Sequence, residues 1–294
     1  MPETILPPDN EFRNVLDSHG YGFQYSVIRF ADTLYKTSKS GWHFVWAEFP
    51  VSVQAKEGQS KDTKIDLVLQ NGRLPYYMLG ECKKVNPALC QWCFARAPYT
   101  HPNPNNLKLL FEAIDVISLD QVAAIDPKRP YRLISSIFPT RAGNIFHVGV
   151  ELKSNKKGDA QGSSGRGAIE DAIGQILRGV NGMVEYFTTH QQSLQPGYKV
   201  VLVPVIFTTA NLWISEVDLG SADLGTGSIA VDTASLKPAP WLWLNYNQSP
   251  GLKHSLAGQE QYHGMDDMLE AEFTRSIAIV NALGIEDFLR RFQL

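Results

Sequence analysis

Two carboxylates and one ammonium group stand close together in a short, strand-rich stretch of the chain. Asp66 lies in an apolar and β-branched run at residues 64–69, and Glu81-Cys82-Lys83 ends a second apolar run that begins at Leu74. Asn71-Gly72 between the runs is a strong turn signal, so we predict a β-hairpin. Because side chains alternate along a strand, we expect Glu81 and Lys83 on one face of the sheet and Cys82 on the other.

The expected pairing of the two strands indicates how close the carboxylates of Asp66 and Glu81 lie. Pairing close to Asn71-Gly72 would place Asp66 across from residues 76–78, and strand twist with a staggered end would bring its carboxylate towards Glu81. Charges at the end of an apolar strand pair are costly to bury without a partner. A divalent metal ion is a suitable partner for two carboxylates, because such ions accept oxygen ligands. The same charges also fit a purely structural role, at an exposed strand end where they discourage edge pairing.

The elements around the hairpin indicate how it is held. Residues 42–54 are rich in aromatic and β-branched residues, which predicts a strand that contains Glu48. Residues 198–209 form a near-continuous apolar run, typical of a strand covered on both faces. Apolar residues at helical spacing predict helices, which we place at 11–18, 23–37 and 168–188, the last containing Gln175. We therefore predict an α/β fold with a mixed central β-sheet flanked by helices.

The remaining segments suggest an insertion and an extension. Residues 1–209 are expected to form the core, with an insertion at about 85–167, and residues 210–294 a C-terminal extension that packs on the core or serves oligomerisation. In the insertion we expect a helix at 106–116 and strands at 130–138 and 144–153. In the extension we expect strands at 212–217, 227–231 and 241–246, and helices at 265–283 and 285–292.

The order of these elements and motifs resembles the PD-(D/E)XK nuclease superfamily, which has the restriction-endonuclease-like fold. The residues that carry the resemblance are Ile65-Asp66-Leu67-Val68-Leu69, Glu81-Cys82-Lys83 and Glu48-Phe49-Pro50-Val51. It covers residues 23–84 and 168–209. The position that holds a tyrosine in one large subgroup is Gly179 here, one turn after Gln175, so membership of that subgroup is not indicated.

The resemblance implies a catalytic role for each matching residue. Asp66, Glu81 and Glu48 would be the metal ligands for Mg²⁺ or Mn²⁺. Lys83 would orient the attacking water and offset developing negative charge, and Gln175 would be the helical glutamine near the metal or water.

The resemblance also implies an activity and partners. We expect an endonuclease that hydrolyses phosphodiester bonds of DNA, with RNA left open, that acts as a homo-oligomer, perhaps a dimer, in a bacterial defence or restriction system. One alternative is a catalytically silent module on the same fold that binds nucleic acid or protein. Another is a latent nuclease that needs an activator or oligomerisation.

A second ExK motif competes for the same role. Glu151-Leu152-Lys153 ends an apolar strand directly before the Gln175 helix. We prefer Glu81 and Lys83 because Asp66 lies in the strand before them. If Glu151 and Lys153 held the metal, residues 64–84 would be scaffold.

Other candidate sites are weaker. Cys90-x-x-Cys93 with His101 resembles a zinc knuckle but lacks an obvious fourth ligand. The aromatic residues of 241–246 fit base stacking less well than a place in the core or in an oligomer contact. The sequence contains no Walker-type GK[ST] loop, which argues against ATP hydrolysis.

Charge and composition limit the partners and the compartment. The net charge is −3, but residues 201–294 carry 5 Lys/Arg against 11 Asp/Glu, while Lys128–Arg178 is basic. If the protein binds a polyanion, we expect the contact at Lys128–Arg178 and not at the C-terminus. The alternative is that these residues form a solvated basic face. Three cysteines argue against a disulfide framework. We find no apolar run of membrane-spanning length and no signal-like N-terminus, so we expect a cytoplasmic protein without a membrane contact.

Overall fold

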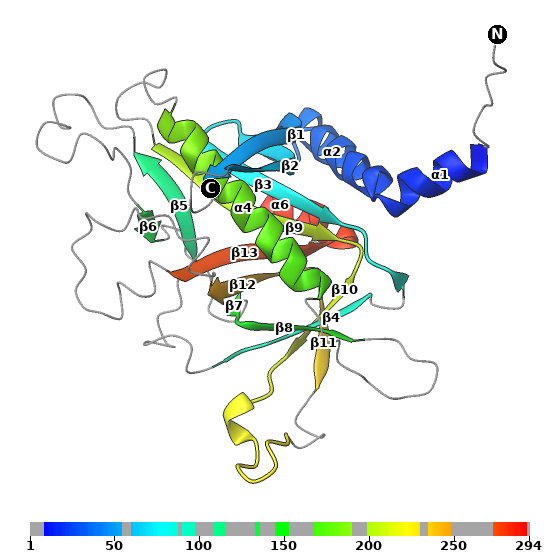
Figure 1. The fold of residues 1–294 in the computed structure, drawn as a ribbon, viewed down its shortest axis with the longest axis vertical. Helices are drawn as coiled ribbons and strands as arrows, with labels where there is room; N and C mark the ends of the chain where they lie inside the picture. The colour runs from blue at the N-terminus through cyan, green and yellow to red at the C-terminus, as the bar shows by residue number, and fades with distance from the viewer. Residues whose placement is uncertain are drawn as a thin grey trace, which may run out of the picture.

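The structure is a computed structural model that describes residues 9–54, 60–87, 90–97, 109–115, 133–135, 145–152, 167–189, 199–229, 235–247 and 273–292. A nine-stranded mixed sheet forms its centre (Figure 1). The strands run in the order β1 (Trp42–Gln54), β2 (Ser60–Asn71), β3 (Tyr76–Lys83), β9 (Lys199–Thr208), β13 (Thr274–Asn281), β12 (Trp241–Asn247) and β7 (Ile145–Phe146). β5 (Leu110–Asp115) pairs with β9, and β6 (Leu133–Ser135) pairs with β5.

Both parallel and antiparallel pairs occur in this sheet. β3 runs parallel to β9, and β9 runs parallel to β13. The β1–β2–β3 meander and the β12–β13 pair are antiparallel. The predicted α/β class with a mixed central sheet flanked by helices is confirmed.

Helices cover both faces of the sheet (Figure 1). α4 (Ala168–Thr189) packs on one face, while α2 (Tyr21–Lys36) and α6 (Ile285–Arg291) pack on the other. The apolar run of β9 explains this arrangement, because Val200, Leu202 and Ile206 join the core beneath α4. Its alternate residues Val201, Val203, Val205 and Phe207 join the core beneath α2 and α6.

Two glycines let α4 approach the sheet closely. A Cβ atom on Gly179 would lie 2.9 Å from Ile65 Cγ1, and one on Gly182 would lie 2.5 Å from Val51 Cβ. Both distances are shorter than van der Waals contact, so only glycine permits this spacing. The Gly179 position that departs from the family pattern therefore has a packing function here.

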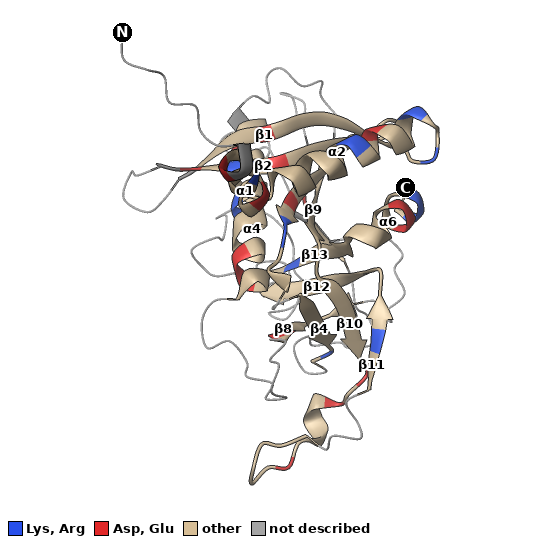
Figure 2. Ribbon diagram, turned by 90° about the vertical axis from the view of Figure 1, so that its right-hand side faces the viewer, with Lys and Arg blue, Asp and Glu red and all other residues tan. Residues whose placement is uncertain are grey.

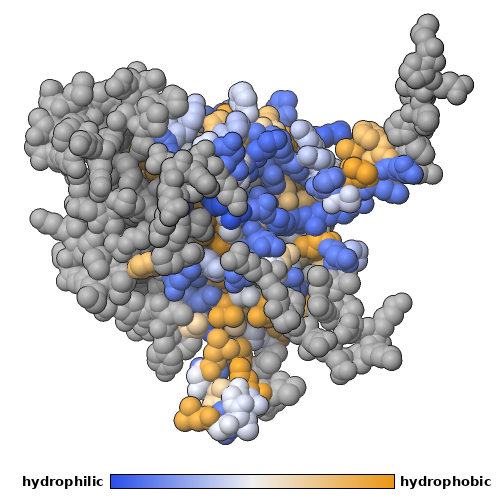
Figure 3. Space-filling model, viewed as in Figure 1, coloured by the Kyte–Doolittle hydropathy of each residue, from blue (hydrophilic) through white to orange (hydrophobic). Residues whose placement is uncertain are grey.

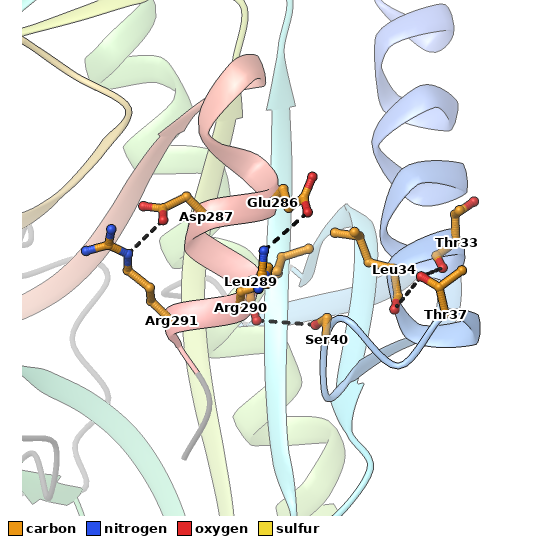
Figure 4. A network of polar contacts seen from close by, with 9 residues as sticks. All are labelled: Thr33, Leu34, Thr37, Ser40, Glu286, Asp287, Leu289, Arg290 and Arg291. Atoms are coloured by element: carbon orange, nitrogen blue, oxygen red, sulfur yellow. Dashed lines mark hydrogen bonds and ion pairs between the residues drawn. The ribbon is translucent and has the colours of Figure 1, made fainter.

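The C-terminal helix is tied to the start of β1. Ser40 donates a hydrogen bond to the Leu289 carbonyl oxygen at 3.3 Å, a contact that joins α6 to the connection between α2 and β1 (Figure 4). The Trp42 indole donates to the Phe292 carbonyl oxygen at 2.7 Å, and the two rings stack 5.8 Å apart. These contacts hold α6 over the sheet.

A smaller second sheet lies below the first in Figure 1. Its four strands run in the order β11 (Leu236–Ala239), β10 (Asn211–Ser215), β4 (Gln91–Ala95) and β8 (Val148–Leu152). Single 3₁₀ turns occur at η5 (Leu219–Ser221) and η8 (Ala282–Gly284). The predicted strand at 227–231 is wrong for residues 227–229, which belong to no β-strand. Its last two residues lie outside the described ranges.

Two predicted helices are strands instead. The helix expected at 106–116 is wrong for Leu110–Asp115, which forms β5, and the one expected at 265–283 is wrong for Thr274–Asn281, which forms β13. Residues 106–108, 116 and 265–272 lie outside the described ranges. Both segments are short apolar runs, which periodicity alone does not assign to helix or strand. β5 forms backbone hydrogen bonds with β9, and β13 forms them with β9 and β12, so both segments are strands. The strand expected at 144–153 is interrupted at His147, and its two halves join different sheets.

The expected boundary at residue 209 does not separate a core from a peripheral extension. β12 and β13 lie within the main sheet beside β9, and β10 and β11 complete the second sheet with strands from the predicted insertion. The described strands after residue 209 thus belong to the same two sheets as the strands before it.

α1 (Asp9–Ser18) projects away from the sheet at the right of Figure 1. Its exposed apolar residues Phe12, Val15 and Leu16 follow helical spacing and form the orange patch near the N-terminus in Figure 3. Among the described residues, no helix is both long and apolar enough to span a membrane.

The close helix–sheet contact leads to a stability prediction. We expect Gly182→Ala to lower the free energy of unfolding by roughly 1–3 kcal/mol, because the new methyl group overlaps the rigid Val51 side chain. A Cβ atom on Gly22 in α2 would meet no other atom within 4 Å, so Gly22→Ala should raise the free energy of unfolding by roughly 0.4–1 kcal/mol. Urea denaturation of the two variants checks this pair, and an equal effect of both would contradict it.

Candidate functional site

The register of the β2–β3 hairpin brings the two carboxylates together. Leu67 pairs with Gly80, so one further step places Asp66 opposite Glu81. The prediction that Asp66 faces residues 76–78 is wrong, because the hairpin does not turn tightly at Asn71-Gly72. Residues 72–75 form a longer connection, in which the Asn71 side chain accepts hydrogen bonds from the backbone N–H groups of Arg73 and Leu74. The longer loop shifts the register towards Glu81 without any need for stagger.

Asp66 is held by the neighbouring strand. Its Oδ2 atom accepts a hydrogen bond from the Cys82 backbone N–H at 2.7 Å. Among the described residues, Oδ1 accepts none. One carboxylate oxygen of Asp66 is therefore oriented by the protein, and the other is available to a ligand.

Glu81 and Lys83 meet α4 on one face of the sheet, as predicted. The Lys83 ammonium lies 3.3 Å from Glu81 Oε1 and donates a hydrogen bond to Gln175 Oε1. Cys82 packs against the core beneath α2 and α6 on the opposite face. Gln175 of α4 thus fixes the lysine beside the glutamate.

α4 runs antiparallel to β3 across this face. Gln175 contacts Lys83 near one end of the strand, and the Phe187 ring lies 5.4 Å from that of Tyr77 near the other. Twelve helical residues rise about 18 Å and six strand residues about 20 Å, so helix and strand keep in step between these contacts. Arg178, one turn after Gln175, then lies over Glu81, and its charge acts on that carboxyl group. The sequence prediction missed Arg178, although its i+3 spacing from Gln175 was a signal for the same helix face.

Glu48 adopts a strained backbone conformation close to Asp66. Its φ is 51° in the middle of β1, which is rare for a residue with a side chain, and a register shift lies nearby between Phe44 and Trp46. The buried Gln24 of α2 donates to Glu48 Oε1 at 2.7 Å and to the Asp66 carbonyl oxygen at 2.9 Å. Lys64 lies 3.4 Å from Glu48 Oε2. Both oxygens of Glu48 therefore have protein partners, and the contact with Gln24 holds Glu48 next to Asp66.

Burial strongly perturbs the acid groups of the site. Desolvation raises the pKa of Asp66 to about 6, opposed by the Cys82 N–H and assisted by the charge of Glu48. Desolvation and the charge of Asp66 raise the pKa of Glu81 to about 8, although Lys83 acts in the other direction. Burial also raises the pKa of the Cys82 thiol, which argues against a thiolate nucleophile. Two carboxyl groups with so little solvation would gain from a cation that binds both.

Two carboxylate groups suit a cation that keeps several water molecules among its ligands. Within the described ranges, no three His, Cys, Asp or Glu side chains are placed together to hold a metal ion. Asp66 Oδ1 and Glu81 Oε2 remain without a hydrogen bond in the part of the chain that the structure describes. Two carboxylates, with water and substrate oxygens, are a set that Mg²⁺ accepts. Asp66 and Glu81 therefore fit such an ion, while Glu48 is not joined with them in a three-carboxylate group.

The competing ExK motif has a different structural role. Glu151 lies in β8 of the second sheet, where its buried Oε1 accepts a hydrogen bond from the Ile169 N–H at 2.8 Å. It thereby caps the first turn of α4, where a negative charge is favourable. Lys153 lies outside the described residues. Within the described ranges, the residue opposite Glu151 on the neighbouring strand is Trp92, whereas the hairpin places Asp66 opposite Glu81.

The weaker candidates do not form a site within the described residues. Cys90 and Cys93 are free thiols. Cys90 directly precedes β4, Cys93 lies within that strand, and His101 lies outside the described ranges. Trp243 is buried in the core beneath α6, and the Trp241 indole donates to Asp287 at 2.9 Å. This bears out the expectation that the aromatic residues of 241–246 belong to the core.

Surface charge does not by itself locate a partner. Basic and acidic residues are interspersed along α2 and α6 (Figure 2). Most of the basic stretch Lys128–Arg178 lies outside the described residues. Its last member, Arg178, is the cation that reaches the site.

Comparisons of the chain with models of known families, with characterised proteins and with solved structures find no match. The resemblance to the PD-(D/E)XK superfamily therefore stays a prediction from the motifs.

The raised pKa of Glu81 leads to a prediction on stability. The folded state holds the Glu81 proton more tightly than the unfolded chain, so stability is lost as pH rises from about 4.5 to about 8. Glu81→Gln removes that ionisation. We expect the variant to match wild type near pH 4 and to unfold several degrees higher near pH 9, in buffer containing EDTA.

Thermal unfolding of both proteins across this pH range measures the difference directly. The exposed Glu11→Gln in α1 serves as the control and should show no such growth with pH. A Glu81→Gln effect that is the same at pH 4 and pH 9 would contradict the burial argument.

Proposed function

We propose that the protein is a Mg²⁺- or Mn²⁺-dependent nuclease that hydrolyses phosphodiester bonds of DNA. The observation that carries the proposal is the pairing of Asp66 with Glu81 across adjacent strands, with Lys83 held beside Glu81 by Gln175. A buried pair of acids with a lysine at its edge is a grouping that phosphodiester hydrolysis uses.

Each residue has a role that follows from its contacts. Asp66 and Glu81 would hold the ion through the oxygens that the protein leaves open. Bound there, the ion would polarise a phosphate oxygen and lower the pKa of a water molecule. Lys83 presents its ammonium group at the edge of Glu81, where it offsets negative charge on the reacting phosphate. Gln175 and Gln24 are positioning residues, which restrict Lys83 and the Glu48–Asp66 pair.

Further parts of the proposal rest on the resemblance alone. These are the choice of DNA over RNA, a homo-oligomer and a role in bacterial defence or restriction. A cytoplasmic location is proposed from the sequence, which has no apolar run of membrane-spanning length. A catalytically silent nucleic-acid-binding or protein-interaction module is the second candidate. It is favoured by the engagement of both Glu48 oxygens, which leaves two open carboxylates at the site.

Cleavage assays test the site assignment. Plasmid and linear DNA incubated with Mg²⁺ or Mn²⁺ should be cut by the wild-type protein and not in EDTA. We expect Asp66→Asn, Glu81→Gln and Lys83→Ala each to lower the cleavage rate by about 100-fold or more, since each removes charge needed in the transition state.

Glu151→Gln is the matched control for these variants. The amide keeps an oxygen that accepts the Ile169 N–H bond, so this variant should retain the rate of wild type. Equal rates for Lys83→Ala and wild type would exclude the assigned site. Binding of DNA by a wild type that cuts no substrate under any of these conditions would favour the silent module.

Metal binding provides a prediction that does not depend on turnover. Because a carboxyl group must lose its proton to bind the ion, Mn²⁺ should raise the unfolding temperature more at pH 8.5 than at pH 5.5. The double variant Asp66→Asn/Glu81→Gln should lose this shift, and Glu151→Gln should keep it. An undiminished Mn²⁺ shift in the double variant would place the ion elsewhere.

A further inference from the structure

Arg178 is a half-buried cation near the site, and the proposed reaction assigns it no role. It lies one turn after Gln175 on the same face of α4, above Glu81. Its guanidinium folds back along the helix, where Nη1 lies 3.3 Å from the position of a Cβ on Gly174. Gly174 therefore leaves room for the guanidinium beside Gln175 and the end of β3.

The two cations of this face differ in their engagement. Lys83 is bound to both Glu81 and Gln175. For Arg178, no hydrogen bond or ion pair connects its guanidinium to another group among the described residues. It lowers the pKa of Glu81 only through its field, without direct contact. No Arg178 nitrogen is among the buried side-chain atoms that lack a partner in the described part of the chain, so its donors are open to solvent and to a ligand.

The chemistry of the missing partner follows from the donor geometry and the local charge. Arginine offers a planar fork of N–H donors that matches two oxygens of a phosphate. Asp66, Glu81 and Glu48 are balanced in number by Lys83, Arg178 and Lys64, so a bound divalent cation would leave the site positive. An anionic ligand is then favoured on the α4 side of the site.

We propose that Arg178 is a phosphate-binding residue that takes the backbone of a polynucleotide on the α4 side of Glu81, next to the reacting phosphate. The identity of the anion as a polynucleotide rests on the proposed function. The presence of an anion site at Arg178 rests on the position of its guanidinium and on the local charge. Arg178 thus adds substrate binding to a helix that otherwise positions Lys83.

The test measures DNA binding by a variant that is expected not to cleave DNA. This variant also lacks the Glu81 carboxylate, so any effect of Arg178 on binding cannot act through the charge of Glu81. Glu81→Gln serves as the parent, and the probe is a fluorescein-labelled 12-base-pair DNA duplex in EDTA, titrated at several salt concentrations. Adding Arg178→Ala should weaken binding by about tenfold or more, as expected for a lost charged hydrogen bond. It should also reduce the slope of log K against log salt by about 0.9, as expected for one phosphate contact.

Two further variants separate charge, geometry and folding. Arg178→Lys should keep the salt slope but recover only part of the affinity, because the ammonium lacks the bidentate fork. Arg73→Ala, on the exposed loop at the far end of the hairpin, should change neither quantity. Thermal unfolding verifies that each variant is folded, and Arg178→Gln replaces Arg178→Ala if the latter is not.

The outcomes distinguish this inference from the proposed nuclease activity. Unchanged affinity and slope in Arg178→Ala would overturn it, and would leave a role limited to the charge of Glu81. Absence of duplex binding by the parent would overturn it as well. Arg178-dependent binding by a protein that cleaves no DNA would uphold it while the nuclease proposal fails.

Discussion

The burial of two carboxylates side by side within a strand pair is the interaction on which the rest of the site depends. Glu81 is only 5% exposed, and Asp66 lies opposite it with one oxygen bound to the neighbouring backbone. Such a pair is unstable as two anions unless cations approach closely. Lys83 approaches from the same strand, and Arg178 from α4. The site is therefore a balance of buried charge that an added divalent cation and a phosphate would complete.

The close packing of α4 on the sheet makes this balance possible. Gly179 and Gly182 bring the helix axis nearer to β1 and β2 than larger residues allow. At that spacing the Gln175 side chain reaches Lys83 on the adjacent β3. Glu151, which resembled a catalytic acid, contributes to the same arrangement by capping the first turn of α4. Structural and chemical requirements thus meet in one helix.

On the face of the sheet that α2 covers, a second set of contacts holds the site residues Glu48 and Asp66. Gln24 of α2 connects Glu48 and the backbone of Asp66, and it does so while almost fully buried. The positive φ of Glu48 costs conformational energy, of the order of 1–3 kcal/mol for such a residue. Local strain of this kind persists only where surrounding contacts determine it, as Gln24 and Lys64 do here. Two layers of helices therefore each supply one amide side chain to the centre of the sheet.

The sequence by itself determined the hairpin, the face on which Glu81 and Lys83 lie, the strand with Glu48 and the helix with Gln175. These follow from local alternation and periodicity, which act over a few residues. Tertiary structure decided the register of Asp66, because β3 begins at Tyr76, where it pairs with Val201 of β9, and this leaves a longer loop than the Asn-Gly pair suggests. It also decided that residues 274–281 are a strand, since the partner strand β9 lies far away in the chain. Arg178 joined the candidate site for the same reason: only the packing of α4 against β3 shows which carboxylate its charge reaches.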